Sequence, residues 1–221
     1  MDALIIGDSH VLRLIKTLGK PQPHSDCNCE EKHSIYTQGL PIEMKMSFHK
    51  GKCAWKSKEI INEINPCVKK NVKKETIILP SFGFIDCKIQ LNRYNDVEET
   101  VSRYMQAYFD SFPENEIRFI EPMPQFIDDQ LIGNGREIHK FESRYNNYKK
   151  FVYYLRSKSE LNGLKEPISI EKILGVDQLD ESYECHECAY CLEPESIGIR
   201  WDHLKFNYNK IICEEIVKEI M

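Results

Sequence analysis

Short apolar runs that alternate with longer amphipathic segments constrain the fold of this chain most. Residues 3–6 and 76–79 are continuous apolar runs, as expected of strands covered on both faces, and residues 117–120 are predicted to be a third strand. The strongest amphipathic stripe lies between residues 97 and 112, and a second long helix is predicted between residues 138 and 155. Strands that alternate with helices of this length are joined by right-handed crossovers. The sequence therefore predicts an α/β fold, with a mainly parallel sheet and helices on both faces.

Weaker patterns predict the remaining elements. Residues 34–48 are expected to form extended segments, and Ser57 is predicted to cap a helix that ends before Pro66. A fourth strand is predicted at residues 173–176, and the final helix carries the apolar positions of residues 212–220.

The size and charge of the chain exclude some functions. With 221 residues, of which 41% are hydrophobic, the chain can fill one core, so we expect residues 1–221 to form a single domain. The net charge is −5 and the lysines are scattered, without a basic stripe, which argues against a nucleic-acid partner. These properties leave the oligomeric state open.

The beginning of the chain and its cysteines indicate a reducing compartment. The apolar run at residues 3–6 is shorter than the roughly 7–15 apolar residues of a secretory signal, and no stretch approaches the ~20 residues of a membrane span. We therefore expect a cytoplasmic protein without membrane contact. The nine cysteines are then expected to be reduced thiols, metal ligands or small buried residues, and not a disulfide framework.

A serine lies where the first predicted strand ends. Gly7, Asp8, Ser9 and His10 directly follow the apolar run, and a helical pattern comes next. Such a turn presents a hydroxyl at the carboxyl edge of the sheet, where the N-terminus of the helix supplies N–H donors for an oxyanion. The arrangement is typical of acyl-transfer nucleophiles. The alternative is a plain strand-to-helix turn with Ser9 as the N-cap.

A second segment ends a buried strand at the same edge. Residues 79–88 read Leu-Pro-Ser-Phe-Gly-Phe-Ile-Asp-Cys-Lys. Gly83 can bring a backbone N–H close to a substrate because it has no side chain in the way. Asp86 is expected to hold the loop by accepting backbone N–H bonds. The alternative is an ordinary turn between a strand and a helix.

A histidine near the other end of the chain is the candidate base. His203 lies just before the final predicted helix, and an imidazole can take the proton of a serine hydroxyl near neutral pH. Asp202 is the nearest carboxylate, so Ser9, His203 and Asp202 form the candidate catalytic set. The alternative for His203 is an ordinary polar residue ahead of a helix.

These segments resemble the sequence blocks of the SGNH (GDSL-type) hydrolase superfamily. Residues 7–10 resemble the first block, in which the serine is the nucleophile. Residues 81–88 resemble the Gly-x-Asn-Asp block, and resemble even more a subgroup that has Phe-Gly-Glu-Ile-Asp-Cys-Arg there. Residues 38–51, with Gly39, resemble the glycine-rich second block more loosely, and residues 202–204 resemble the final Asp-x-x-His-Leu block.

The resemblance runs from residue 4 to about residue 210 and implies both a fold and a site. The implied fold is a flavodoxin-like three-layer α/β sandwich. The implied site has Ser9 as nucleophile and His203 as base, and it requires no cofactor. The N–H groups of Ser9 and Gly83 would hold the oxyanion, while Asp8, Gly39 and Asp86 would belong to the oxyanion or substrate-binding part. A glycan substrate is implied by the subgroup alone.

One departure from the family pattern concerns the oxyanion hole. The asparagine of the Gly-x-Asn-Asp block falls on Ile85, whose side chain cannot donate a hydrogen bond. Loss of one such donor typically costs ~10²–10³ in rate.

A second departure concerns the acid that orients the base. The family places it three residues before the histidine, where this chain has Arg200. Asp202 is adjacent to His203, and adjacent side chains of an extended segment point in opposite directions. Glu195, Asp177, a backbone carbonyl or a simple Ser–His dyad are the alternatives.

A cysteine cluster lies in an insertion around residues 180–195. Cys185, Cys188 and Cys191 have zinc-knuckle spacing, and with His186 they would nearly complete a tetrahedral site. A structural zinc is therefore one interpretation. A loop of reduced thiols is the other, because no second Cys-x₂-Cys pair follows at the usual distance.

Other side chains have simpler interpretations. His49 is expected to be a surface histidine, with substrate contact as the alternative. The aromatic stripe of Tyr104, Tyr108 and Phe109 is expected to belong to the core and not to a ligand site.

Together these features predict a serine ester hydrolase that removes, or transfers, a short acyl group such as acetyl on a carbohydrate or small alcohol. The expected partner is a small-molecule or glycan ester. One alternative is a catalytically impaired SGNH-like sugar-binding module, which Ile85 and Arg200 suggest. Another is an interaction module stabilised by zinc.

Overall fold

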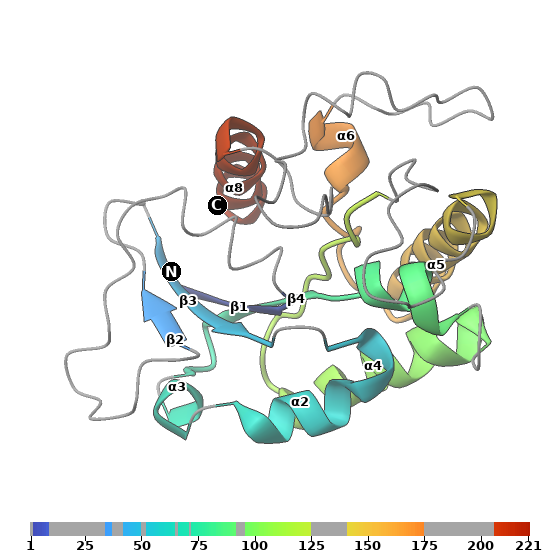
Figure 1. Cartoon of the computed structure of the whole chain (residues 1–221). Helices are drawn as coiled ribbons and strands as arrows, with labels where there is room; N and C mark the ends of the chain where they lie inside the picture. The colour runs from blue at the N-terminus through green and yellow to red at the C-terminus, as the bar shows by residue number, and fades with distance from the viewer. Residues whose placement is uncertain are drawn as a thin grey trace, which may run out of the picture.

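The central sheet has the strand order β2-β3-β1-β4 (Figure 1). In this computed structural model, β1 (Asp2–Gly7) pairs in parallel with β3 (Glu43–Phe48) on one side and with β4 (Ile77–Ser81) on the other. The short β2 (Ser34–Tyr36) is antiparallel to β3 at the edge. The structure describes residues 2–8, 34–36, 42–49, 52–64, 66–70, 72–91, 96–124, 141–174 and 206–221.

The sheet continues beyond β4 through single parallel bridges. Ile78 pairs with Ile117, and Ile120 pairs with Ile168. The bridges rest on hydrogen bonds such as Arg118 N–H to Ile78 O, at 2.9 Å, and Ile168 N–H to Phe119 O, also at 2.9 Å. The predicted third strand at residues 117–120 is therefore paired where expected, and the mainly parallel α/β fold is confirmed.

The prediction of a fourth strand at residues 173–176 is wrong for residues 173 and 174, which belong to helix α6 (Ile170–Leu174). Residues 175 and 176 lie outside the described part of the chain, and the residue that pairs with the sheet here is Ile168. Ser169 explains the change, because its hydroxyl accepts the backbone N–H of Lys172 at 3.4 Å and begins a helix directly after the bridge.

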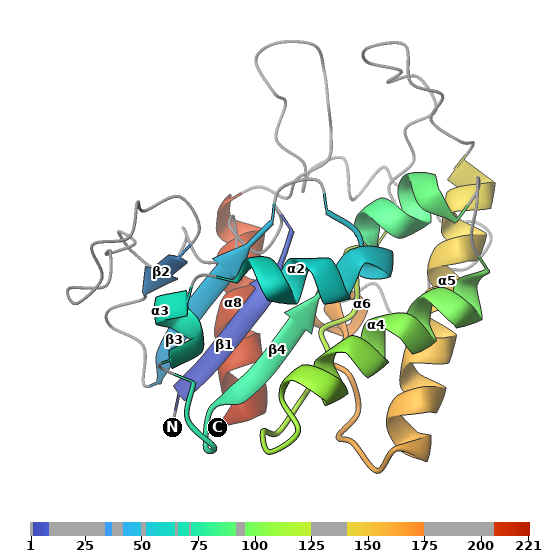
Figure 2. The same cartoon turned by 90° about the horizontal axis from the view of Figure 1, so that it is seen from below.

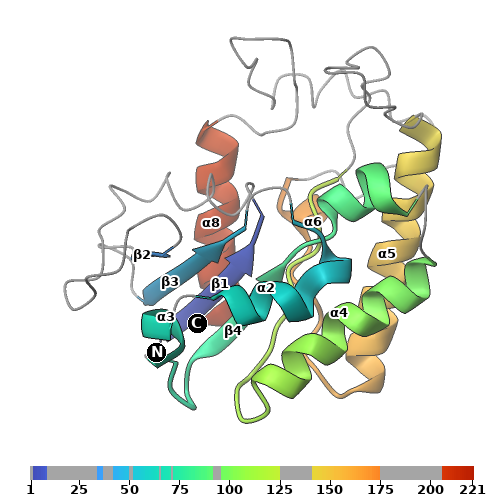
Figure 3. The same ribbon diagram turned by 60° about the horizontal axis from the view of Figure 1, so that its bottom comes forward.

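Helices cover both faces of the sheet. Helices α2 (Ser57–Glu63), α4 (Val97–Ser111) and α5 (Phe141–Leu161) lie on one face, and α8 (Phe206–Ile220) lies on the other (Figures 1 and 3). Alternate side chains of β1 point to opposite faces of the sheet. Leu4 and Ile6 belong to the core cluster on the side of α4, and Ala3 and Ile5 point to the other face. The short elements are η1 (Ala54–Lys56), α3 (Pro66–Lys70) and the π-type turn η2 (Asp86–Gln90).

The aromatic stripe of α4 belongs to the core, as predicted. Tyr104 and Tyr108 are fully buried, and their rings meet edge to face with centroids 5.5 Å apart. The ring of Phe119 packs against Tyr104 with a centroid distance of 5.1 Å, and Phe109 is partly buried beside the same cluster. The stripe therefore joins α4 to the strand region at residues 117–120.

Ser57 begins α2 but does not cap it as predicted. Its hydroxyl donates a hydrogen bond to the carbonyl oxygen of Ala54 at 2.7 Å and accepts no N–H of the first turn. The reason is that η1 precedes α2 directly, so the chain is already helical where a cap would have to be extended.

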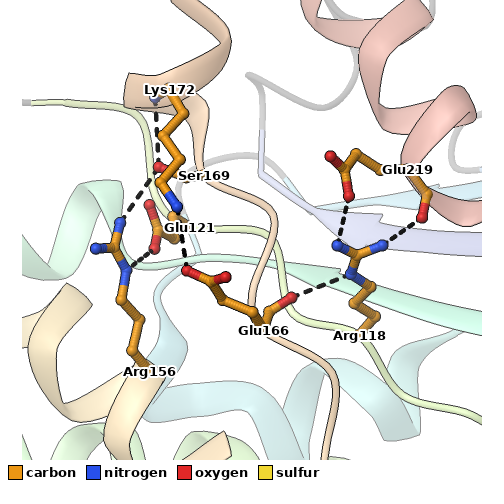
Figure 4. A network of polar contacts seen from close by, with 7 residues as sticks. All are labelled: Arg118, Glu121, Arg156, Glu166, Ser169, Lys172 and Glu219. Atoms are coloured by element: carbon orange, nitrogen blue, oxygen red, sulfur yellow. Dashed lines mark hydrogen bonds and ion pairs between the residues drawn. The ribbon is translucent and has the colours of Figure 1, made fainter. Parts of the chain in front are cut away.

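One arginine anchors the end of α8 to the sheet (Figure 4). Arg118 donates from Nε to the carbonyl oxygen of Glu166 at 3.1 Å, and from its two terminal nitrogens to the carbonyl oxygen and the carboxylate of Glu219. A cation at this position also complements the negative end of the helix dipole. The C-terminus of α8 thus lies at the amino edge of the strands, and α8 starts at the carboxyl edge (Figure 2). Among the described residues, no helix has the length and apolar character needed to cross a membrane.

Replacing this arginine should loosen α8. We expect Arg118→Met to lower the free energy of unfolding by about 1–3 kcal/mol, because charge-assisted bonds to three acceptors are lost from a side chain that is largely buried. Urea unfolding measures the change. Lys165→Met is the matched control: it breaks an exposed ion pair with Glu116, and it should cost less than about 1 kcal/mol. Equal losses in the two variants would contradict the anchoring role.

Candidate active site

The carboxyl ends of the parallel strands meet at one edge of the sheet. The register places Gly7 of β1 beside Phe48 of β3 and Ser81 of β4. Figure 2 shows the ends of β1, β3 and β4 at this edge. Asp8 and His49 are the residues that follow β1 and β3, so both lie there. In open α/β sheets this is the edge where ligands bind, which makes it the candidate active site.

Asp8 follows β1 directly and is almost completely buried. The phenol of Tyr104 on α4 has a pKa well above its ordinary value. Burial is the largest cause, followed by Tyr108, and the negative charges of Asp86 and Asp8 act in the same direction. Tyr104 therefore stays protonated. Its oxygen accepts the backbone N–H of Phe82 at 3.2 Å, which fixes the chain one residue before Gly83.

Gly83 has a backbone conformation that requires glycine. Its φ angle is +120°, and a Cβ built there would lie 2.9 Å from two ring carbons of Phe151 and 3.2 Å from Cβ of Pro122. The carbonyl of Gly83 accepts the N–H of Cys87 at 2.9 Å and so begins the following turn. The absent side chain of Gly83 thus makes room for Phe151 and Pro122, and the approach of its backbone N–H to a substrate stays a prediction.

Asp86 lies inside the protein and ties two segments together. One carboxylate oxygen accepts the N–H of Ala54 at 2.6 Å, and the other accepts the N–H of Trp55 at 3.2 Å. Burial raises the pKa of Asp86 to about 6, although these backbone hydrogen bonds act in the opposite direction. The expected acceptor role is therefore present, and two of the donors, Ala54 and Trp55, belong to η1 and not to its own loop. Because the carboxylate is fully buried, it positions the site and does not itself reach a substrate.

Ile85 occupies the position at which the related block has an asparagine. It directly precedes η2 and is partly exposed. Its side chain brings no hydrogen-bond donor to this edge, so backbone amides are the donors that this segment can offer to an oxyanion.

His49 is buried, so the expectation of a surface histidine is wrong. Only 7% of the residue is exposed, and its Nε2 lies 2.9 Å from the hydroxyl oxygen of Ser47. Its Nδ1 lies 3.9 Å from a carboxylate oxygen of Glu63 on α2. Serine, histidine and glutamate thus approach each other, but Ser47 is fully buried within β3 and cannot attack a substrate. The extended backbone and the cover of α2 explain the burial of His49.

Several predicted site residues lie outside the described part of the chain. These are Ser9, Gly39, Asp202 and His203, together with the zinc candidates Cys185, Cys188 and Cys191. Among the described residues, no group of three or more histidine, cysteine or acidic side chains could hold a metal ion.

Cys53, Cys87 and Cys213 are buried free thiols. Burial raises the pKa of Cys53 to about 11 and that of Cys213 to about 12, and it also raises the pKa of Cys87. These thiols therefore remain protonated near neutral pH, and neither metal binding nor nucleophilic attack is favoured.

Sequence reasoning missed the contacts that support this edge. The bond from Phe82 to Tyr104 and the pairing of His49 with Ser47 have no signature in the local sequence. The burial of His49 could have been predicted only with the bounds of β3 known, because His49 continues the alternation of residues that face the core along that strand.

Comparison with known proteins identifies the fold. No protein-family model matches the chain, and no curated protein matches it in sequence. Solved structures do match. A lipolytic protein of the G-D-S-L family from Veillonella parvula superposes with a TM-score of 0.56 at 11% identity, covering 99% of this chain and 97% of that chain. An aryl esterase from M. smegmatis, solved with an inhibitor, gives 0.56 at 11% identity, with coverage of 99% and 97%.

A third match is phospholipase A1 from Streptomyces albidoflavus, with a TM-score of 0.53 at 10% identity, covering 99% of this chain and 98% of that chain. Likeness at such low identity concerns the fold alone. The chain therefore has the α/β fold of the GDSL (SGNH) lipolytic proteins, as the sequence blocks had predicted.

The conformation of Gly83 leads to a stability prediction. We expect Gly83→Ala to lower the free energy of unfolding by about 2–5 kcal/mol, because the strained φ angle adds to a clash with the ring of Phe151. Gly163→Ala is the control, since Gly163 has a φ angle of +66° but open space around it, and it should cost only about 1–2 kcal/mol. Thermal unfolding of both variants measures the difference, and equal costs would contradict the close packing at Gly83.

The raised pKa of Asp86 predicts how stability changes with pH. The folded protein holds the proton of Asp86 up to a pH of about 6, whereas the unfolded chain releases it near 3.8. Between these values the folded state binds more protons, so the contribution of Asp86 to the free energy of unfolding falls as pH rises, by on the order of 3 kcal/mol in all. Above pH 6 it is constant.

The variant Asp86→Asn tests this, because its amide does not titrate. The stability of Asp86→Asn relative to the wild type should rise across the window between the two pKa values and level off above it. Urea unfolding of both proteins at several pH values from about 4 to about 7 gives the two curves. Parallel curves would rule out the assigned titration.

Proposed function

We propose that this chain is a serine ester hydrolase of the SGNH type. The observation that carries the proposal is the arrangement at the carboxyl edge: β1 ends with Gly7 beside Ser81, the last residue of β4, so that Asp8 and the segment that leads to Gly83 leave the sheet at the same edge. Ser9 follows Asp8 directly in the sequence. The fold shared with esterases and lipolytic proteins supports the same reaction class.

The proposed reaction uses Ser9 and His203. His203 takes the proton of the Ser9 hydroxyl while the oxygen attacks the ester carbonyl, and the N–H groups of Ser9 and Gly83 stabilise the resulting oxyanion. His203 then gives its proton to the leaving alcohol as the acyl-enzyme forms. A water molecule, deprotonated by His203, attacks this acyl-enzyme; His203 then gives that proton to the Ser9 oxygen as the acyl bond breaks, which releases the carboxylic acid and restores both residues. No cofactor takes part.

The entry of the chain into α8 supports His203 as the base. Phe206, the first residue of α8, follows His203 by three positions in the sequence, and α8 starts at the carboxyl edge of the sheet (Figure 2). The Arg118 anchor at the opposite end of α8 gives this helix a fixed position. Asp202 is the proposed acid partner.

The proposed substrate is an ester of a short acyl group, such as acetyl, on a carbohydrate or other small alcohol. This part of the proposal rests on the subgroup resemblance of residues 81–88. Whether water or a sugar hydroxyl accepts the acyl group distinguishes a hydrolase from an acyltransferase, because both use the same nucleophile and base.

A second candidate function is binding without catalysis. Ile85 favours it, because the partly exposed side chain before η2 is apolar where a donor would assist the oxyanion. A sugar-binding module with this fold would still bind a ligand at the carboxyl edge of the sheet, but its Ser9 would not be activated for attack. A zinc-stabilised module would in addition bind metal through Cys185, Cys188 and Cys191.

Labelling with a fluorophosphonate probe tests the proposed enzyme. We expect the wild type to label and both Ser9→Ala and His203→Ala to lose labelling, because the probe reacts only with an activated serine. Ser102→Ala is the matched control and should label fully, since that hydroxyl lies on the exposed face of α4 and bonds to the carbonyl of Glu98.

An unlabelled wild type, beside a known serine hydrolase that labels in the same reaction, would overturn the enzyme proposal. Binding of acetylated sugars would then support the second candidate. Metal analysis of protein purified without added zinc decides the zinc-stabilised form, which requires about one equivalent of zinc.

A further inference from the structure

We propose that His49 is a positioning residue for the turn that carries Ser9, acting from the covered face of the sheet. The inference rests on the proposed hydrolase function. It assigns to His49 no contact with the substrate. Its role is to hold the end of β1 where the nucleophile turn begins.

The backbone of His49 fixes the last residue of β1. Its N–H donates to the carbonyl oxygen of Gly7 at 2.8 Å, one position beyond the last register pair of β1 and β3, Gly7 with Phe48. Gly7 is also paired with Ser81 of β4. The final peptide before Asp8 is therefore held from both sides, and His49 supplies the bond nearest to the turn.

The side chain of His49 locks this arrangement. Its Nε2 lies 2.9 Å from the hydroxyl oxygen of Ser47, which is fully buried. A buried polar group without a partner is costly, so the imidazole cannot rotate away without leaving the Ser47 hydroxyl unpaired. The end of β3 is thus rigid as well as paired.

Helix α2 holds the other side of the imidazole. A carboxylate oxygen of Glu63 lies 3.9 Å from Nδ1, and the same carboxylate pairs with Lys52 at 3.3 Å. The N–H of Lys52 in turn donates to the carbonyl oxygen of His49 at 3.2 Å. His49 therefore links the exit of β3 to the helix that covers it.

Asp8 and His49 occupy neighbouring positions on the same face. The register pairs Ile6 with Ser47, and both side chains are buried on the side of α4 and α2. Two residues further along each strand are Asp8 and His49, and the effect of Asp8 on Tyr104 agrees with this face. Removing the imidazole would therefore open space beside Asp8, the residue that precedes Ser9 in the sequence.

A small displacement of a nucleophile has a large effect on rate. A shift of about 1 Å can cost on the order of 10² in rate, although ground-state binding of the substrate changes little. The inference thus predicts that loss of the His49 side chain lowers kcat, and the rate constant of serine labelling, by about 10- to 100-fold, with KM within about threefold.

The experiment compares four proteins in two assays. Fluorophosphonate labelling gives a rate constant for Ser9, and hydrolysis of p-nitrophenyl acetate gives kcat and KM. His49→Ala should show the predicted loss. His49→Gln should recover most of the rate, because its amide can still bond to Ser47. Lys45→Met is the matched control on the same strand, since it breaks the buried ion pair with Asp2 at 2.6 Å, at the far end of β1. It should lower the melting temperature without lowering either rate.

The outcomes separate this inference from the proposed function. If the wild type labels and His49→Ala labels equally fast, the positioning role is overturned and the hydrolase proposal stands. If Lys45→Met loses as much rate as His49→Ala, the loss reflects general destabilisation, and the positioning role is also overturned. A wild type that does not label overturns both.

A second variant keeps the test decisive if His49→Ala does not fold. Ser47→Ala removes the partner of Nε2 and leaves the imidazole in place. The inference predicts that it lowers the labelling rate by about 3- to 10-fold, and an unchanged rate would overturn it.

Discussion

The parallel pairing of β1 on both sides is the constraint on which the rest of this structure depends. The apolar side chains of β1 are buried, so its backbone N–H and C=O groups have no access to water and need partners in β3 and β4. This pairing brings Asp8, His49 and the segment ending in Gly83 to one edge, although they are far apart in the sequence. The helices on the two faces then follow from the need to cover a sheet that is apolar on both sides.

The candidate site is held mainly by contacts that lie behind it. Asp86 accepts two amide hydrogens of η1, the Tyr104 hydroxyl accepts the amide of Phe82, and His49 bonds to Ser47 and Gly7. Each of these groups is buried, so each bond is hard to replace with water and the geometry at the edge is rigid. Such support is what a site needs if small displacements are to be avoided during a reaction. It also means that substitutions at these positions change stability and activity together, which is why matched controls are needed.

The departures from the family pattern affect the two halves of the proposed chemistry differently. Ile85 brings no side-chain donor to the proposed oxyanion hole, but the proposed backbone donors, the amides of Ser9 and Gly83, do not depend on side-chain identity. Arg200 concerns the base, because it stands where an acid would orient His203. A hydrolase with a weaker oxyanion hole is therefore consistent with these residues, and so is a module that retains the fold and has lost the reaction.

The amino-acid sequence by itself determined the elements and their order. The apolar run before Gly7, the run before Ser81 and the stripe of α4 follow from local periodicity, which the chain carries whatever it packs against. Gly83, just beyond β4, was also visible in the sequence, whereas the turn at Ser9 lies outside the described residues and stays a prediction. Only the tertiary structure decided that His49 is buried, that Asp86 binds amides 32 and 31 residues earlier in the chain, and that Ile168 pairs with the sheet whereas residues 173 and 174 are helical. The physical reason is that burial and hydrogen-bond partners come from segments that meet only on folding, and desolvation by those segments sets the energy of each polar group.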